Sequence, residues 1–168
     1  MPHSSLTTFD EQLLQIDHLR AYPAMLPFVG PDYAGSDHRK LLVVGESNYF
    51  PEKSTAHSDA PQWYAGDQAS LTQDEVDWIN CRVLLECSWS SPGHKMYREI
   101  NQCLRSLPLQ YTDRPVATIA YMNAFQRPAR TGQSFQACYQ PLDREKSLDV
   151  MRGVIRCLAA IPGEWNSA

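Results

Sequence analysis

Two short segments hold the polar side chains best suited to chemistry. The first, Gly45-Glu46-Ser47-Asn48-Tyr49, directly follows the apolar run 41–44. A carboxylate beside a buried strand is costly unless it is paired or used, so we predict a catalytic role for Glu46. The second segment begins at Asn123, directly after the apolar run 116–122. The predicted binding residues are Gly45, Ser47, Asn48, Tyr49, Asn123 and Arg127.

Each of these residues also has a purely structural interpretation. Gly45 would allow a tight turn, and Ser47 or Asn48 would cap the next element, as turn residues often do. Arg127 is equally suited to be the salt-bridge partner of Glu46. Both interpretations stay open at the level of sequence.

The two apolar runs predict the strands that would position these side chains. Residues 41–45 form a continuous apolar run without alternation, which is typical of a parallel strand covered on both faces. Residues 116–122 predict a second strand, and helical segments separate the two. We therefore predict an α/β fold with three layers, α/β/α, around a central parallel sheet. Ligands bind beyond the carboxyl ends of such strands, so the two polar segments should meet there.

Helices and loops are indicated by capping boxes, apolar spacing and proline. Thr8 with Glu11, and Thr72 with Glu75, each match the capping box that begins a helix. Proline and glycine punctuate the predicted loops. Helices are predicted over 8–23, 72–83, 96–107 and 143–160, and ordered loops over 23–40 and 50–70.

Composition limits the classes of protein that this chain could belong to. Its 168 residues suit one domain, 1–168, and its net charge of −4 gives no general attraction to nucleic acid. We expect no membrane span and no secretory signal, and hence a cytoplasmic location. Five cysteines without CxxC spacing argue against disulfides and zinc, so we expect no metal. No glycine-rich phosphate or dinucleotide loop is present, so we expect no cofactor.

The two polar motifs together resemble the uracil-DNA glycosylase-like superfamily. The matching residues are Gly-Glu-Ser-Asn-Tyr after the first strand and Tyr-Met-Asn-Ala-Phe-Gln-Arg-Pro at the second. The resemblance implies that Glu46 positions water, that Tyr49 packs beside a base and that Asn123 reads the edge of uracil. It implies a nucleic acid or a nucleotide as partner and hydrolysis of an N-glycosidic bond.

The sequence departs from that family at two positions that matter for catalysis. Ser47 stands where the best-known branch has the aspartate that activates water. The C-terminal His-Pro-Ser loop is absent, because none of the histidines lies near the end of the chain: His3, His18, His38, His57 and His94. Two functions therefore compete: a glycosylase-like enzyme, and a catalytically inactive member that binds a nucleotide, a nucleic acid or another protein.

The end of the chain predicts an incomplete sheet. Helix 143–160 carries an apolar stripe of Leu148, Met151, Ile155 and Leu158, which should be buried. Residues 161–168 are too short and too broken by proline and glycine to form another core strand. We therefore expect an open sheet edge with an apolar patch near this helix, and self-association into a homo-oligomer.

Overall fold

The computed structural model describes residues 4–36, 38–88, 95–107 and 115–159. Its described sheet has three strands in the order β1 (Phe28–Val29), β3 (Ile119–Arg130) and β2 (Leu41–Phe50). β2 and β3 are parallel neighbours, with Leu41 opposite Ile119, so the predicted parallel pair is confirmed. β1 is antiparallel to β3. The sheet is therefore mixed and not the fully parallel sheet that was predicted.

β1 lies inside the segment that was predicted as a loop. Phe28 and Val29 are fully buried and pair with Tyr121 and Ala120 of β3. A two-residue strand is too short to show an alternating pattern in the sequence. Its pairing with β3, and not a local preference, holds it in place. That is why a segment rich in proline and glycine gave no strand signal.

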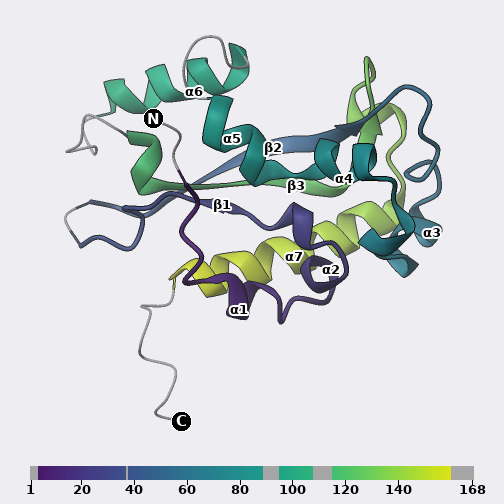
Figure 1. Cartoon of the computed structure of the whole chain (residues 1–168), viewed down its shortest axis with the longest axis horizontal. Coiled ribbons are helices and arrows are strands. Elements are labelled where there is room, and N and C mark those ends of the chain that lie inside the picture. The colour runs from purple at the N-terminus through teal and green to yellow at the C-terminus, as the bar shows by residue number, and fades with distance from the viewer. Residues whose placement is uncertain (1–3, 37, 89–94, 108–114, 160–168) are drawn as a thin grey trace.

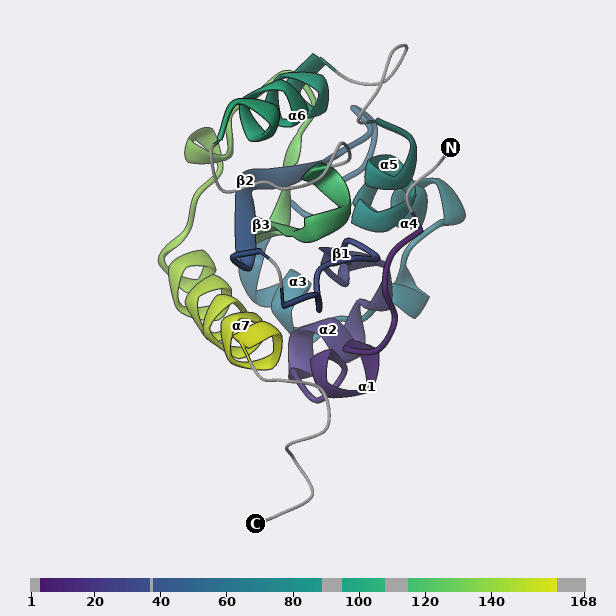
Figure 2. The same cartoon turned by 90° about the vertical axis from the view of Figure 1, so that its left-hand side faces the viewer.

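Helices cover both faces of the sheet (Figures 1 and 2). On one face lie α1 (Asp10–Leu13), α2 (Asp17–Ala21) and α7 (Pro141–Ala159). On the other lie α4 (Gln73–Ile79), α5 (Cys81–Ser88) and α6 (Lys95–Ser106). No helix in the described ranges is long and apolar enough to span a bilayer. The remaining elements are α3 (Ala60–Ala65) and four 3-10 turns, η1 (Pro23–Met25), η2 (Gln68–Ser70), η3 (Pro115–Thr118) and η4 (Phe135–Ala137).

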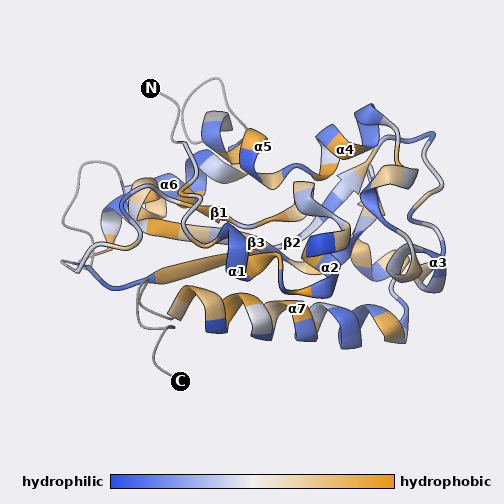
Figure 3. Cartoon of the chain, turned by 60° about the horizontal axis from the view of Figure 1, so that its bottom comes forward, coloured by the Kyte–Doolittle hydropathy of each residue, from blue (hydrophilic) through white to orange (hydrophobic). Residues whose placement is uncertain are grey.

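Two hydrophobic clusters fill the spaces between these layers. The α7-side cluster includes Trp63 and Val154, and the other cluster includes Leu85 and Tyr121. Figure 3 shows hydrophobic residues along the strands and a mixture of both kinds along α7, as expected of an amphipathic helix. The stripe that α7 buries differs from the predicted one, because Ile155 is 49% exposed. The buried stripe consists of Asp143, Ser147, Val150, Val154 and Leu158.

Two predicted helices are each divided in the structure. Residues 8–23 form α1 and α2, and the side chain of Thr8 does not cap α1, whose N-cap is Phe9. The Thr72 capping box is confirmed, since both of its hydrogen bonds are present. The helix that it starts ends at Ile79, and α5 begins at Cys81. Capping patterns mark where a helix starts, but they do not show how long it continues.

β2 lies at the edge of the described sheet and is less buried than its apolar sequence predicts. Leu42 packs in the α7-side cluster, while Leu41 and Val43 pack in the cluster on the other face. Val44 remains 44% exposed. No described strand pairs with the outer side of β2. Residues 161–168, which bear on the predicted incomplete sheet, lie outside the described residues.

His18 gives the fold a predicted pH dependence. Its ring packs against Tyr22 and Tyr64, at centroid distances of 5.0 and 5.5 Å, and burial lowers its pKa to about 4. The unfolded chain therefore binds this proton more readily, and stability falls as pH drops below the ordinary pKa of histidine. Between about pH 7 and about pH 4.5 we expect His18 to remove roughly 2 kcal/mol, measured by urea denaturation. The free energy of unfolding of the wild type minus that of a His18→Leu variant should therefore fall by that amount at the lower pH. The same difference at both pH values would contradict the prediction.

Candidate functional site

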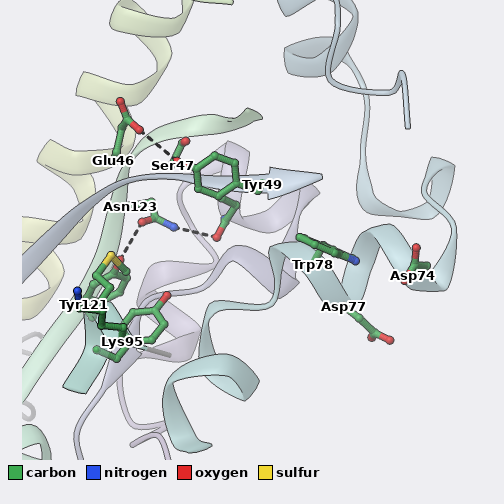
Figure 4. A pocket seen from close by; sticks show the side chains of 12 residues that line it. Glu46, Ser47, Tyr49, Asp74, Asp77, Trp78, Lys95, Tyr121 and Asn123 are labelled. Atoms are coloured by element: carbon green, nitrogen blue, oxygen red, sulfur yellow. Dashed lines mark hydrogen bonds between the residues drawn. The ribbon is translucent and has the colours of Figure 1, made fainter. Parts of the chain in front are cut away.

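A cavity of about 680 Å³ opens between β2, β3, α4 and α6 (Figure 4). This volume is in the range of small-molecule sites. β2 and β3 provide Glu46, Ser47, Asn48, Tyr49, Tyr121 and Asn123. α4 and α6 provide Asp74, Asp77, Trp78, Lys95, Met96 and Tyr97. Five of the seven residues predicted for the site thus line one cavity, and the other two are Gly45 and Arg127.

The floor of the cavity is a buried polar network centred on Asn123. Asn123 is 6% exposed, and its Nδ2 donates to Asn48 Oδ1 at 2.8 Å. Its Oδ1 accepts a hydrogen bond from Tyr121 Oη at 3.0 Å. The thiol of Cys81 also donates to Asn48 Oδ1, at 3.4 Å. These bonds fix the orientation of both amides before any ligand arrives.

Gly45 is required for a close approach between strands and not for a turn. It lies inside β2, directly opposite Asn123, so the predicted loop at 45–49 is part of the strand. A Cβ atom at this position would lie 2.1 Å from Tyr121 Oη and 2.4 Å from Asn123 Oδ1. Only glycine leaves room for the hydrogen bond between those two side chains.

An irregular register brings Asn48 to the cavity. Side chains alternate along a strand, so Asn48, three positions after Gly45, would face away from Asn123 in a regular pair. The pairing shifts between Ser47, which lies opposite Phe125, and Tyr49, which lies opposite Ala129. Asn48 alone therefore spans residues 126–128 of β3. Pro128 lies in this irregular stretch, where a missing N–H is tolerated. The bulge is therefore what allows Asn48 to contact Asn123.

Two buried polar atoms of the cavity lining have no hydrogen-bond partner among the described residues. They are Asn48 Nδ2 and Ser47 Oγ, and each residue is only 7% exposed. An unpaired buried donor or acceptor costs roughly 1–3 kcal/mol. Such groups are rare in folded proteins and call for an explanation, of which a ligand is one.

The ionisable groups near the floor are held in their neutral forms. Burial raises the pKa of Cys81 and of Tyr97 to about 11 and about 12, and raises the pKa of Tyr121 further. A neutral thiol is a poor nucleophile. The floor therefore offers its thiol and phenol groups in their neutral forms, as hydrogen-bonding groups.

The rim of the cavity is acidic. Asp74 and Asp77 project from α4, Glu46 comes from β2, and Lys95 is the cationic side chain among the described lining residues. Tyr49 Oη donates a long, 3.4 Å hydrogen bond to Glu46 Oε2. In Figure 4 the Glu46 carboxylate lies on the opposite side of β2 from Asn123. Glu46 and Asn123 thus share a cavity without facing each other across it.

Arg127 neither lines the cavity, as a predicted binding residue should, nor pairs with Glu46, which was the alternative interpretation. It is fully buried, and its Nε and Nη2 donate to Asp143 of α7 at 2.8 and 2.6 Å. Its guanidinium also donates to the carbonyl oxygens of His57 and Cys138, each at 2.6 Å, and lies over the ring of Phe135. Five donors in a planar fork suit such a buried clamp between β3 and α7.

The residues that α4 and α6 contribute were not predicted from sequence. Trp78 is 40% exposed and lies outside the apolar stripe of its own helix. A large aromatic residue on the polar face of an amphipathic helix is a signal that could have identified this wall. Asp74, Asp77 and Lys95 carry no such signal, because charged residues are normal on exposed helix faces.

Comparison with known proteins gives no independent indication of function. No family model, curated protein or solved structure matches the chain. Among the described residues, no group of histidine, cysteine, aspartate and glutamate is arranged to hold a metal ion.

Proposed function

We propose that this chain is a uracil-DNA glycosylase-like protein that binds a nucleobase in the cavity between β2, β3, α4 and α6. The observation that carries the proposal is the pair of unpartnered buried polar atoms, Asn48 Nδ2 and Ser47 Oγ, beside the ordered amide of Asn123. A ligand with a polar edge would satisfy them. A nucleobase combines such an edge with a flat ring.

The hydrogen-bonding capacity left over on the floor suits the carbonyl-rich edge of uracil. Asn48 Nδ2 offers two N–H donors, and Ser47 Oγ can donate or accept. Asn123 Oδ1 has accepted one hydrogen bond, from Tyr121, and can accept a second, such as that of a ring N–H. Donors beside an acceptor match the alternating C=O and N–H groups of a pyrimidine edge.

The walls of the cavity provide aromatic surface for the face of the ring. Tyr49, Trp78 and Tyr97 line it from three elements, and the first two are 37% and 40% exposed. Stacking of a base on an aromatic side chain is worth roughly 1–3 kcal/mol. The floor would provide selectivity and the walls most of the affinity.

The charge at the rim favours a free base or a nucleoside over a nucleic acid. Asp74, Asp77 and Glu46 outnumber Lys95, and the whole chain has a net charge of −4. Protein–DNA affinity depends mainly on cations that neutralise phosphates. An acidic rim would repel the phosphates on either side of a flipped base.

Hydrolysis of an N-glycosidic bond is the second candidate, and the Glu46 carboxylate at the rim is the observation that supports it. Cleavage needs a positioned water or anion near the sugar and donors that stabilise the departing base. Glu46 lies across β2 from Asn123, and no histidine is among the described lining residues. Binding without cleavage therefore fits the geometry better.

A titration with uracil, followed by the tryptophan fluorescence of the chain, to which Trp78 of the cavity wall contributes, tests the binding proposal. We expect saturable binding, weakened about tenfold or more by Asn48→Ala, because that variant removes the unpartnered donor. Asn80→Ala is a matched control, since Asn80 accepts a hydrogen bond from the Val83 amide outside the cavity. Equal affinity in wild type and Asn48→Ala would refute the proposed site.

Release of free uracil from a uracil-containing oligonucleotide separates the two candidates. The binding proposal predicts no release above background by the wild-type chain. Release that is lost in Glu46→Gln, with the fold unchanged by circular dichroism, would establish hydrolysis instead.

A further inference from the structure

The outer edge of β2 carries side chains that do not line the nucleobase site, among them Leu42 and Val44. β2 is the last strand of the described sheet, and no described strand pairs with its outer side. An unpaired edge presents a row of backbone N–H and C=O groups on which another strand can pair. The side chains along this edge determine which strand fits.

Four alternating residues on one face of this edge form a short stripe. The edge stripe is Leu42, Val44 and Glu46 of β2 with Lys40, which directly precedes the strand. Leu42 packs in the α7-side cluster, and Lys40 Nζ lies 5.8 Å from the ring of Tyr33, a member of the same cluster. Alternation along the strand puts Val44 and Glu46 on that same side. Val44 is 44% exposed, and both charged residues of the stripe are exposed.

The edge stripe is complementary to itself when it is reversed. We propose that two copies of this chain associate by antiparallel pairing of β2 with β2, about a twofold axis at Val43. In that register Lys40 lies opposite Glu46 of the partner subunit. Leu42 lies opposite Val44 of the partner subunit, so the exposed apolar side chain is covered. Opposite charges and apolar pairs directly across an antiparallel ladder are both favourable.

The signs of the charges favour a second copy over simple protection of the edge. Charged residues on edge strands commonly prevent aggregation. Protection of that kind requires charges that repel a second copy in the register that pairs the apolar residues. Here Lys40 and Glu46 have opposite charges and are equally far from Val43 along the sequence. A second copy is therefore attracted, and the charges specify its register.

The proposed interface leaves the floor of the cavity undisturbed. Asn123 and Tyr121 lie on the other side of β2 from Glu46 in Figure 4. The floor hydrogen bonds are made within one chain. Association of two copies and binding of uracil are therefore measured separately, and failure of one leaves the other standing.

Sedimentation velocity of the full chain over micromolar to millimolar concentrations tests the proposal. We expect the wild type to approach the mass of a dimer as the concentration rises. Lys40→Glu or Glu46→Lys should each weaken dimerisation about tenfold or more, because like charges then lie opposite each other. The double variant Lys40→Glu with Glu46→Lys should recover the wild-type dimer, which a nonspecific apolar contact would not do.

An exposed valine elsewhere gives a matched control. Val44→Lys should abolish dimerisation, whereas Val83→Lys, on α5 and 58% exposed, should not. A wild-type chain that stays monomeric throughout overturns the proposal. So does slow hydrogen exchange of the outer β2 amides in a monomer, which would show that another part of the chain covers the edge. A double variant that stays monomeric overturns the proposed register.

Discussion

Replacing Arg127 with alanine is expected to lower the free energy of unfolding by about 3–5 kcal/mol. The substitution leaves the fully buried Asp143 without its cationic partner. It also removes the donors to the carbonyl oxygens of His57 and Cys138. A buried charge whose partner has been removed is one of the most destabilising single changes in a folded protein. Urea denaturation followed by circular dichroism measures the loss.

An exposed ion pair on α7, the helix that carries Asp143, is the control for this measurement. Arg152 and Asp149 are 3.8 Å apart and both mostly exposed, so Arg152→Ala should change stability by roughly 0.5 kcal/mol at most. Arg127→Met combined with Asp143→Leu should recover much of the loss, because neither charge then remains buried. If Arg127→Ala were no more harmful than Arg152→Ala, the clamp would not hold α7 to β3.

Substitution of Gly45 by alanine is expected to weaken the proposed binding of uracil strongly. The added methyl group would lie 2.1 Å from Tyr121 Oη and 2.4 Å from Asn123 Oδ1, so at least one of these buried side chains must move. We expect the dissociation constant to rise at least tenfold and stability to fall by about 1–3 kcal/mol. The fluorescence titration with uracil and a thermal melt give the two values.

Gly66→Ala separates the effect on binding from the effect on stability. A Cβ at Gly66 would lie 3.0 Å from Tyr22 Oη, which is a tight contact remote from the cavity lining. This variant should lose some stability and retain uracil affinity. Wild-type affinity in Gly45→Ala would mean that the close approach at Gly45 is irrelevant to the ligand.

The sequence predicted the parallel strand pair, because apolar runs reflect burial directly. It did not predict where each strand lies in the sheet. The run 41–44 looks fully buried, yet Val44 is exposed because β2 has one strand neighbour in the described sheet. Burial of a residue depends on which elements pack beside it, and hydropathy alone does not contain that information.

The site was partly predictable for a similar reason. The polar residues at the ends of the apolar runs include Asn48 and Asn123, and both line the cavity. Arg127 looked the same in sequence, but its partner Asp143 lies on a helix packed against the other face of the sheet. Long-range partners of this kind follow from the three-dimensional fold and leave no local pattern.

The cavity is built from two kinds of element, and this division constrains how related proteins could diverge. Its floor lies on two strands whose register bulge also places Arg127, so changes at 126–128 would disturb α7 as well. Its aromatic and charged walls come largely from α4 and α6. A lineage could therefore exchange the wall residues to accept a new ligand while inheriting the floor unchanged. Substitutions on the helices would then change the walls, while the hydrogen bond between Asn48 and Asn123 in the floor stays in place.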